Sequence, residues 1–104
     1  MKIIVEERVD QAIDAFYDAA ILSHWHTLSY ETVERKKNRL YDGLESLVHY
    51  ATIFPKARLK QEWIKNNWQE FICEYFHFAY EITVDVRGEK VIVIHDAVHS
   101  FIYR

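Results

Sequence analysis

The 104-residue chain has few of the residues that form cross-links or interrupt helices and strands: one cysteine, one proline and two glycines. Because Cys73 has no partner in the chain, an intramolecular disulfide is excluded, and a small domain without disulfides is typical of a reducing compartment. With so little proline and glycine, the chain has few forced turns, so we expect mostly regular structure with short connections. The expected location is the cytoplasm.

Long apolar segments and an excess of positive charge are also missing. The apolar run at residues 1–5 gives way to Glu6, Glu7 and Arg8, so it is too short for a signal peptide or a membrane span, and no membrane role is expected. Lys and Arg number 13 against 16 Asp and Glu, a formal charge of -3. A protein that binds nucleic acid over its whole surface is normally basic, so this balance leaves room only for a local basic patch.

Apolar and aromatic residues, in contrast, are abundant. Half of the residues are hydrophobic and 15% are aromatic, enough apolar area to offset the entropy that the chain loses on folding. Disorder is therefore not expected. A chain of this length fits one hydrophobic core, so we expect a single domain over residues 1–104.

The N-terminal half has the pattern of a strand and two helices. Within residues 2–6, Ile3, Ile4 and Val5 are β-branched and are followed by charge, which predicts a short strand. Helical spacing of apolar residues predicts one helix from Asp10, as N-cap, to about His24, and a second from Ser29, as N-cap, to about Tyr50. Pro55 ends the helical region. Two neighbouring helices with a short link form an αα-hairpin.

After Pro55 the apolar spacing changes to about two residues, which predicts a sheet. We expect strands at 58–65 and 68–76 around an Asn66-Asn67 turn, a half-buried strand at 80–86, and a turn at Arg87-Gly88. The apolar run 91–94 predicts a central strand covered by the helices. The fold class is therefore α+β: a short N-terminal strand, a two-helix hairpin and a C-terminal antiparallel sheet.

Three segments carry a resemblance to a known family. They are residues 76–82 (Phe-His-Phe-Ala-Tyr-Glu-Ile), residues 88–94 (Gly-Glu-Lys-Val-Ile-Val-Ile), and Val98-His99 near a Tyr-Arg tail. In this order, after a strand and two helices, they resemble the RelE/ParE superfamily of toxin-antitoxin toxins over nearly the whole chain.

The resemblance implies a toxin that is neutralised by a cognate antitoxin and that acts either as an endonuclease of mRNA on the ribosome or as an inhibitor of DNA gyrase. The nucleases of the family use no metal or cofactor. They activate the ribose 2′-hydroxyl with a base, stabilise the phosphorane with Arg or Lys, and protonate the leaving oxygen.

Residue by residue, the match to the family is mixed. Tyr80 matches the strand tyrosine, whereas His77 stands where the family usually has a catalytic arginine. His99 lies where some nuclease members have a C-terminal catalytic histidine, although gyrase-directed members can have one there too. The resemblance implies an acid-base role for His99, a phosphate-facing role for His77 and a supporting role for Tyr103. Departures from the pattern are the acidic Glu70 and Glu74, where several members have lysines, and Ser100 and Phe101, at positions that are often basic.

Histidine spacing allows a second interpretation. His95 and His99 differ by an even number of residues, so in a regular strand both project from one face and could form an acid-base pair. Alternatively, His95 and His99 are polar residues on the solvent-exposed face of the sheet. Neither this pair nor His24-x-His26 is completed to a zinc set, so no metal is expected. Gly-rich phosphate loops are absent, and Cys73 in an aromatic strand is typical of a small buried hydrophobe.

One stretch has a local excess of positive charge, and tryptophans lie beside it. If RNA binds, we expect it at Arg58, Lys60 and Lys65, with Trp63 and Trp68 for base stacking and Arg104 as a phosphate clamp. The alternative is an edge strand that lysines protect from aggregation, with the tryptophans packed on the helices.

Three functions remain open from the sequence. The first is a RelE-like toxin that cleaves mRNA without a metal. The second is a RelE/ParE-fold protein without the nuclease residues, which binds gyrase or only its antitoxin and which the acidic balance favours. The third is an unrelated α+β binding module, because fold does not fix function. Exposed edge strands would allow a homodimer or a strand added by the antitoxin.

Overall fold

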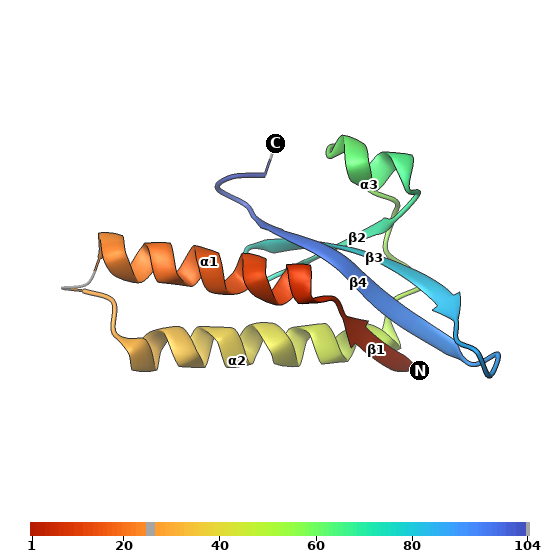
Figure 1. Ribbon diagram of the computed structural model, residues 1–104, viewed down its shortest axis with the longest axis horizontal. Coiled ribbons are helices and arrows are strands. Elements are labelled where there is room, and N and C mark those ends of the chain that lie inside the picture. The colour runs from red at the N-terminus through yellow and green to blue at the C-terminus, as the bar shows by residue number, and fades with distance from the viewer. Residues whose placement is uncertain (25–26, 104) are drawn as a thin grey trace.

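The computed structural model describes residues 1–24 and 27–103. Its elements are, in chain order, β1 (Lys2–Val5), α1 (Glu7–Ser23), α2 (Tyr30–Ser46), the 3-10 helix η1 (Leu47–His49), α3 (Gln61–Lys65), β2 (Gln69–Cys73), β3 (Phe76–Val84) and β4 (Lys90–His99) (Figure 1). The predicted α+β layout of a strand, a two-helix hairpin and a C-terminal antiparallel sheet is confirmed. Among the described residues, no helix combines the length and the apolar character needed to cross a membrane.

The four strands form one sheet in the order β1-β4-β3-β2. β3 pairs antiparallel with β2 on one side and with β4 on the other, and β1 adds parallel to β4 with Ile3 opposite Ile92. β4 is therefore a central strand, and Val91, Ile92 and Ile94 on it are buried. This confirms the prediction made from the apolar run.

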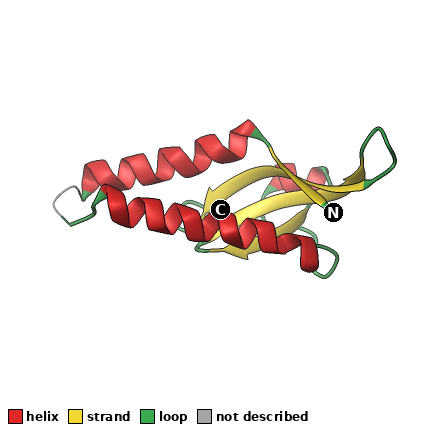
Figure 2. Cartoon of the chain, turned by 90° about the horizontal axis from the view of Figure 1, so that it is seen from below, coloured by secondary structure: helices red, strands yellow, loops and turns green. Residues whose placement is uncertain are grey.

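Helices α1 and α2 lie side by side and cover one face of the sheet (Figures 1 and 2). Their apolar stripes and the facing strand residues form the main core: Val9, Ile13, Tyr17, Val33, Leu40, Leu44, Leu47, Ala51, Phe76, Phe78, Tyr80, Ile92, Ile94 and Ala97. The hairpin extends beyond the sheet (Figure 2) and gives the molecule a long axis of 49 Å. A second, smaller cluster of Ala57, Trp63 and Ala79 covers the opposite face under α3.

The helix boundaries differ from the prediction at two ends. Ser29 caps α2 as expected, since its side chain accepts a hydrogen bond from the Thr32 N–H. α1, however, begins before Asp10, at Glu7. Asp10 instead accepts a hydrogen bond from the Tyr41 hydroxyl and so ties α1 to α2. α2 ends at Ser46, where the chain tightens into η1 rather than continuing to Tyr50.

The predicted strand at 58–65 is wrong, because this segment holds the short helix α3. Asn66-Asn67 ends that helix and is not a hairpin turn. Asn67 has a φ of 60°, and the N–H groups of Asn67 and Trp68 bond back to the carbonyls of Ile64 and Trp63. This is the Schellman arrangement, in which a left-handed residue, here asparagine, closes a helix C-terminus.

The predicted strand at 68–76 is divided by a tight turn. Glu74 and Tyr75, with φ of 49° and 68°, connect β2 to β3, and Cys73 pairs with Phe76. β3 therefore begins at Phe76 rather than near residue 80. Its predicted burial is also wrong at the far end, since Val84 and Val86 are exposed. Gly88, with a φ of 81°, lies in the turn expected between β3 and β4.

Candidate functional site

A bulge in β4 decides which histidines share a face of the sheet. Tyr80 of β3 pairs with Ile94 and Ala79 pairs with Asp96, so His95 is an extra residue without a cross-strand partner. An extra residue breaks the alternation of faces along a strand. The prediction that His95 and His99 project from one face is therefore wrong: His95 stacks on Trp68 on the α3 side, and His99 stacks on Phe16 of α1.

On the α3 side of the sheet, four polar residues form one connected cluster, which we call the outer-face cluster: Glu70, His77, Ser100 and Tyr103. His77 Nδ1 lies 2.8 Å from Glu70 Oε2, and His77 Nε2 lies 3.1 Å from Ser100 Oγ. The Tyr103 hydroxyl donates to Glu70 Oε1 over 2.5 Å. The Tyr103 ring also stacks on His77, with 4.1 Å between ring centroids. The structure thus brings together two of the three predicted catalytic residues, His77 and Tyr103.

The hydrogen-bond partners of this cluster surround the His77 ring. The Ser100 hydroxyl donates to the Tyr75 carbonyl over 2.8 Å, and its oxygen also lies within hydrogen-bond distance of His77 Nε2. On the other side of the ring, ionised Glu70 accepts a hydrogen bond from His77 Nδ1–H. His77 is thus held between a carboxylate and a hydroxyl. Because Ser100 directs its proton at a backbone carbonyl, it is not set up as a nucleophile.

The Glu70–His77 contact is largely shielded from water. The Glu70 side chain is 16% exposed and the His77 side chain 15%. Burial, followed by the hydrogen bond to Glu70 and its charge, raises the pKa of Tyr103 well above its usual range. Tyr103 therefore stays a phenol and a hydrogen-bond donor at neutral pH. Charged hydrogen bonds of this kind are stronger in such an environment than in water.

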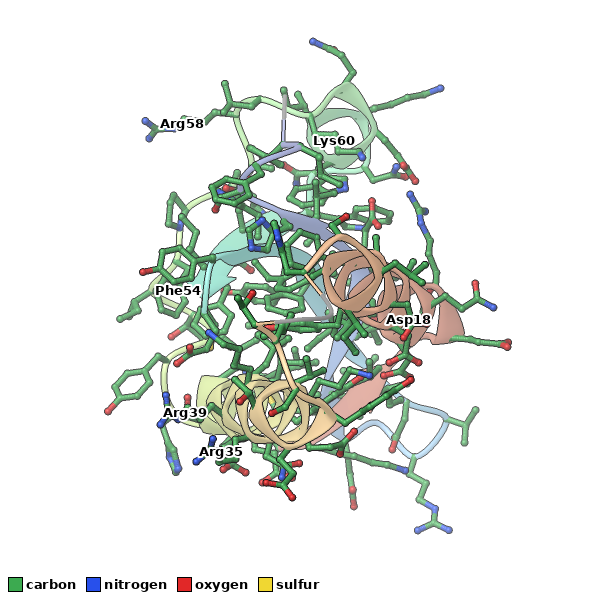
Figure 3. All side chains as sticks on the ribbon, turned by 90° about the vertical axis from the view of Figure 1, so that its left-hand side faces the viewer. Asp18, Arg35, Arg39, Phe54, Arg58 and Lys60 are labelled. Carbon is green, nitrogen blue, oxygen red and sulfur yellow. The ribbon has the colours of Figure 1, made fainter. Side chains whose placement is uncertain are left out.

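Glu70 also lines a groove along the outer edge of β2. The groove has a volume of about 510 Å³ and is formed by Phe54, Pro55, Lys56, Arg58, Leu59, Glu70 and Ile72. Arg58 is exposed and extends away from the molecule on the same side as Phe54 (Figure 3). An aromatic ring and cations such as Phe54 and Arg58 are groups that bind single-stranded RNA, whereas the Glu70 carboxylate in the same groove would repel RNA phosphates.

The other predicted RNA-binding residues have different surroundings. Lys60 Nζ lies 3.8 Å from Asp96 Oδ2 and 5.8 Å from the centre of the Trp63 ring. Lys65 is exposed at the end of α3. Trp63 is fully buried, so it cannot stack on a base, and it packs on the α3 side of the sheet rather than on α1 and α2. Arg104 lies outside the described residues.

Asp96 anchors α3 and α1 to the bulge. It is 4% exposed and accepts hydrogen bonds from Trp63 Nε1 over 2.8 Å and from Arg8 over 2.9 Å. Arg8 also donates two hydrogen bonds to the Glu62 carboxylate of α3. These hydrogen bonds lower the pKa of Glu62, so the two side chains form an ion pair at neutral pH. Asp96 therefore has a structural role, because it connects α1 and α3 to β4.

His99 lies apart from the outer-face cluster, on the face that carries the long helices. Its ring is stacked on Phe16 with 3.8 Å between centroids, and it packs edge-on against Phe76. Nδ1 accepts a hydrogen bond from the Phe101 N–H. Burial, and then the charge of His77, lowers the pKa of His99, so its ring is neutral at neutral pH. His99 and His77 do not form one acid-base pair.

Glu70 and Ser100 were missed as candidate site residues in the sequence. The signal for Glu70 lies in the hairpin register: with the turn at 74–75, Glu70 and His77 become diagonal neighbours on one face. That register cannot be recognised from turn chemistry, because neither Glu74 nor Tyr75 is a typical left-handed residue. Ser100 gives no sequence signal of its own.

The chain matches no family model, no curated protein and no solved structure. Within residues 1–24 and 27–103, no three His, Cys, Asp or Glu side chains come together in a way that could hold a metal ion.

Proposed function

We propose that this protein is a RelE-like toxin of a toxin-antitoxin pair, and that it cleaves mRNA on the ribosome by metal-free acid-base chemistry. One observation supports this most: Glu70 and His77 are hydrogen-bonded to each other, Tyr103 contacts both, and Glu70 lines a groove that carries Arg58. An mRNA target would imply action in the cytoplasm. The cognate antitoxin would be the neutralising partner.

In the proposed reaction, Glu70 acts as the base and His77 as the acid. Glu70 takes the proton of the ribose 2′-hydroxyl while the 2′-oxygen forms a bond to phosphorus. The bond from phosphorus to the 5′-oxygen breaks, and His77 gives its proton to that oxygen. The reacting form has Glu70 ionised and His77 protonated; the products are a 2′,3′-cyclic phosphate and a 5′-hydroxyl, and proton exchange with water restores that form. Such proton transfers contribute about 10²- to 10⁴-fold each.

The histidine at position 77 fits the task of the family's usual arginine. When it is protonated, the ring supplies positive charge near the phosphate, and the adjacent Glu70 carboxylate stabilises that charge. Arg58 adds a second cation on the groove side. The Ser100 hydroxyl lies 3.1 Å from His77 Nε2, so the Ser100 side chain must move before the RNA can reach that nitrogen. Docking on the ribosome would supply the free energy for this rearrangement.

The test is growth of cells after tight induction of the chain, alone and with the neighbouring open reading frame. We expect growth arrest that the neighbour relieves. The variant His77→Phe should abolish arrest, because it keeps the stack on Tyr103 and removes both ring nitrogens. The matched control is His95→Phe, another stacked histidine between carboxylates, Glu6 and Glu81, which should arrest growth like the parent chain.

A second candidate is a protein that binds gyrase or only its antitoxin, without cleaving RNA. The shielding of Glu70 and His77 and the formal charge of -3 favour it. Under this alternative, His77→Phe would still arrest growth, or neither chain would. A homodimer is compatible with either function, but through β2 it could use only the edge beyond Glu70, because Gln69 pairs with Lys56 and the Glu70 N–H bonds to the Pro55 carbonyl.

A further inference from the structure

The segment that follows β4, residues 100–103, lies over the Glu70–His77 pair. Figure 1 shows the chain turning back at the end of β4 toward α3. Ser100 Oγ lies 3.1 Å from His77 Nε2. The Tyr103 hydroxyl donates to Glu70 Oε1, and the Tyr103 ring lies on the His77 ring with 4.1 Å between centroids and 4° between the ring planes. One segment therefore contacts both members of the pair.

These contacts block the approach of a substrate to His77. A general acid must come within hydrogen-bond distance of the atom that it protonates. His77 Nδ1 faces Glu70 and Nε2 faces Ser100, while Tyr103 covers one face of the ring. Glu70 Oε1, in turn, accepts from Tyr103. RNA can thus reach the pair only after the segment has moved.

The segment is attached to the rest of the protein at its two ends. At the first end, the Ser100 N–H and the Ser100 hydroxyl both donate to the Tyr75 carbonyl over 2.8 Å. At the second end, Tyr103 packs on the outer face of the sheet, where its ring also lies 5.4 Å from the Trp63 ring. Tyr103 therefore makes the apolar contacts that hold the far end in place.

Between these two ends the side chains lie mostly in solvent. Phe101 and Ile102 are 81% and 66% exposed, and their N–H groups bond back to His99. A short surface segment with few buried contacts opens locally at a fraction of the free energy of global unfolding. Release of Tyr103 is therefore sufficient to free the far end of the segment.

We propose that residues 100–103 form an autoinhibitory strap, which covers the Glu70–His77 pair in the free protein and lifts when RNA takes the place of Tyr103. A nucleobase has a flat aromatic face, as the phenol ring has, so it can replace Tyr103 on His77. Where binding needs an open state, the apparent affinity falls in proportion to the open fraction. The inference rests on the proposed nuclease function, because the strap limits a site that RNA uses.

The first test of the strap needs no RNA. Diethylpyrocarbonate modifies accessible imidazole nitrogens, and mass spectrometry of the purified full chain gives its rate at each histidine. We expect Tyr103→Ala to raise the rate at His77 at least about fivefold, because the rate scales with the open fraction. His95 is the internal reference, since its side chain is also 15% exposed and lies between two carboxylates. Its rate should change less than about twofold.

Two further variants separate the strap from the stability of the fold. Tyr103→Phe keeps the ring and removes the hydroxyl, so it should raise the rate at His77 less than Tyr103→Ala does. Ile102→Ala removes an exposed side chain of the same segment and should leave the rate unchanged. An unchanged rate at His77 in Tyr103→Ala would overturn the strap. A rise shared by His95 and His99 would also overturn it, because Tyr103 would then support the whole fold.

Cleavage in cells separates the strap from a catalytic role of Tyr103. The strap predicts at least about twofold more new mRNA 5′ ends for Tyr103→Ala than for the parent chain. Fewer ends would show that Tyr103 takes part in the reaction and would overturn the strap. If neither chain gives new ends while the rate at His77 rises as expected, the nuclease function fails and the strap over the pair is supported.

Discussion

His77 and His99 come from neighbouring strands, yet their surroundings differ. His77 lies between the Glu70 carboxylate and the Ser100 hydroxyl. His99 faces two aromatic rings and accepts a backbone N–H, so it stays neutral. At this scale the sequence predicts which residue types are available for chemistry. It cannot predict the face on which each lies, because a single bulge at His95 reverses the alternation.

The lowered pKa of His99 makes folding stability depend on pH. In the unfolded chain His99 takes up a proton near its usual pKa of 6.5, whereas in the folded protein burial delays this to lower pH. The unfolded state therefore binds more protons in that window, so the free energy of unfolding falls as pH drops below about 6.5 and levels off below the folded pKa. In His99→Phe the fall should be smaller. Urea unfolding at several pH values measures it, and parallel curves for both chains would contradict the assignment.

Asp96 is the residue whose loss should cost the most stability outside the apolar core. Asp96→Ala leaves the buried Trp63 N–H without an acceptor and removes a partner of Arg8, so we expect a loss of about 3 kcal/mol in the free energy of unfolding. The control Glu62→Ala removes the exposed partner of Arg8 and should cost less than about 1 kcal/mol. Chemical denaturation measures both. Equal losses would show that Asp96 has no special role.

Among the elements, the long helices and the central strand follow from the sequence, whereas α3 and the β2–β3 hairpin do not. Apolar periodicity over many residues is a strong signal, and it located α1, α2 and the core of β4. The segment 58–76 is short and rich in aromatic residues, and its period resembles a strand. Packing of Trp63 against the sheet overrides that pattern and stabilises a single helical turn.

The turn between β2 and β3 stores backbone strain. Tyr75 holds a φ of 68°, which costs an ordinary residue about 1–2 kcal/mol, and its side chain is 72% exposed. Tyr75→Gly should therefore raise the free energy of unfolding by about 0.5–1 kcal/mol, after the entropic cost of glycine in the unfolded chain. Tyr75→Ala removes the same side chain but keeps the strain, so it should bring no gain. Thermal unfolding of both variants distinguishes strain from packing.

For the whole molecule, the sheet separates two surfaces. The outer face carries the Glu70–His77–Tyr103 cluster and the groove with Arg58, and the inner face carries the long helices and His99. The sequence predicted the α+β layout and two members of the cluster. It could not predict that His99 lies apart from them, because this depends on the strand register that the bulge sets.

The central claim, RNA cleavage at the outer-face cluster, is tested most directly by mapping mRNA 5′ ends in cells that express the parent chain, His77→Phe or His95→Phe. We predict new 5′ ends within translated regions for the parent chain and for His95→Phe, each with a 5′-hydroxyl, and a loss of at least about 100-fold in their abundance for His77→Phe. New ends that persist undiminished in His77→Phe, or growth arrest by the parent chain without any new ends, would contradict the account.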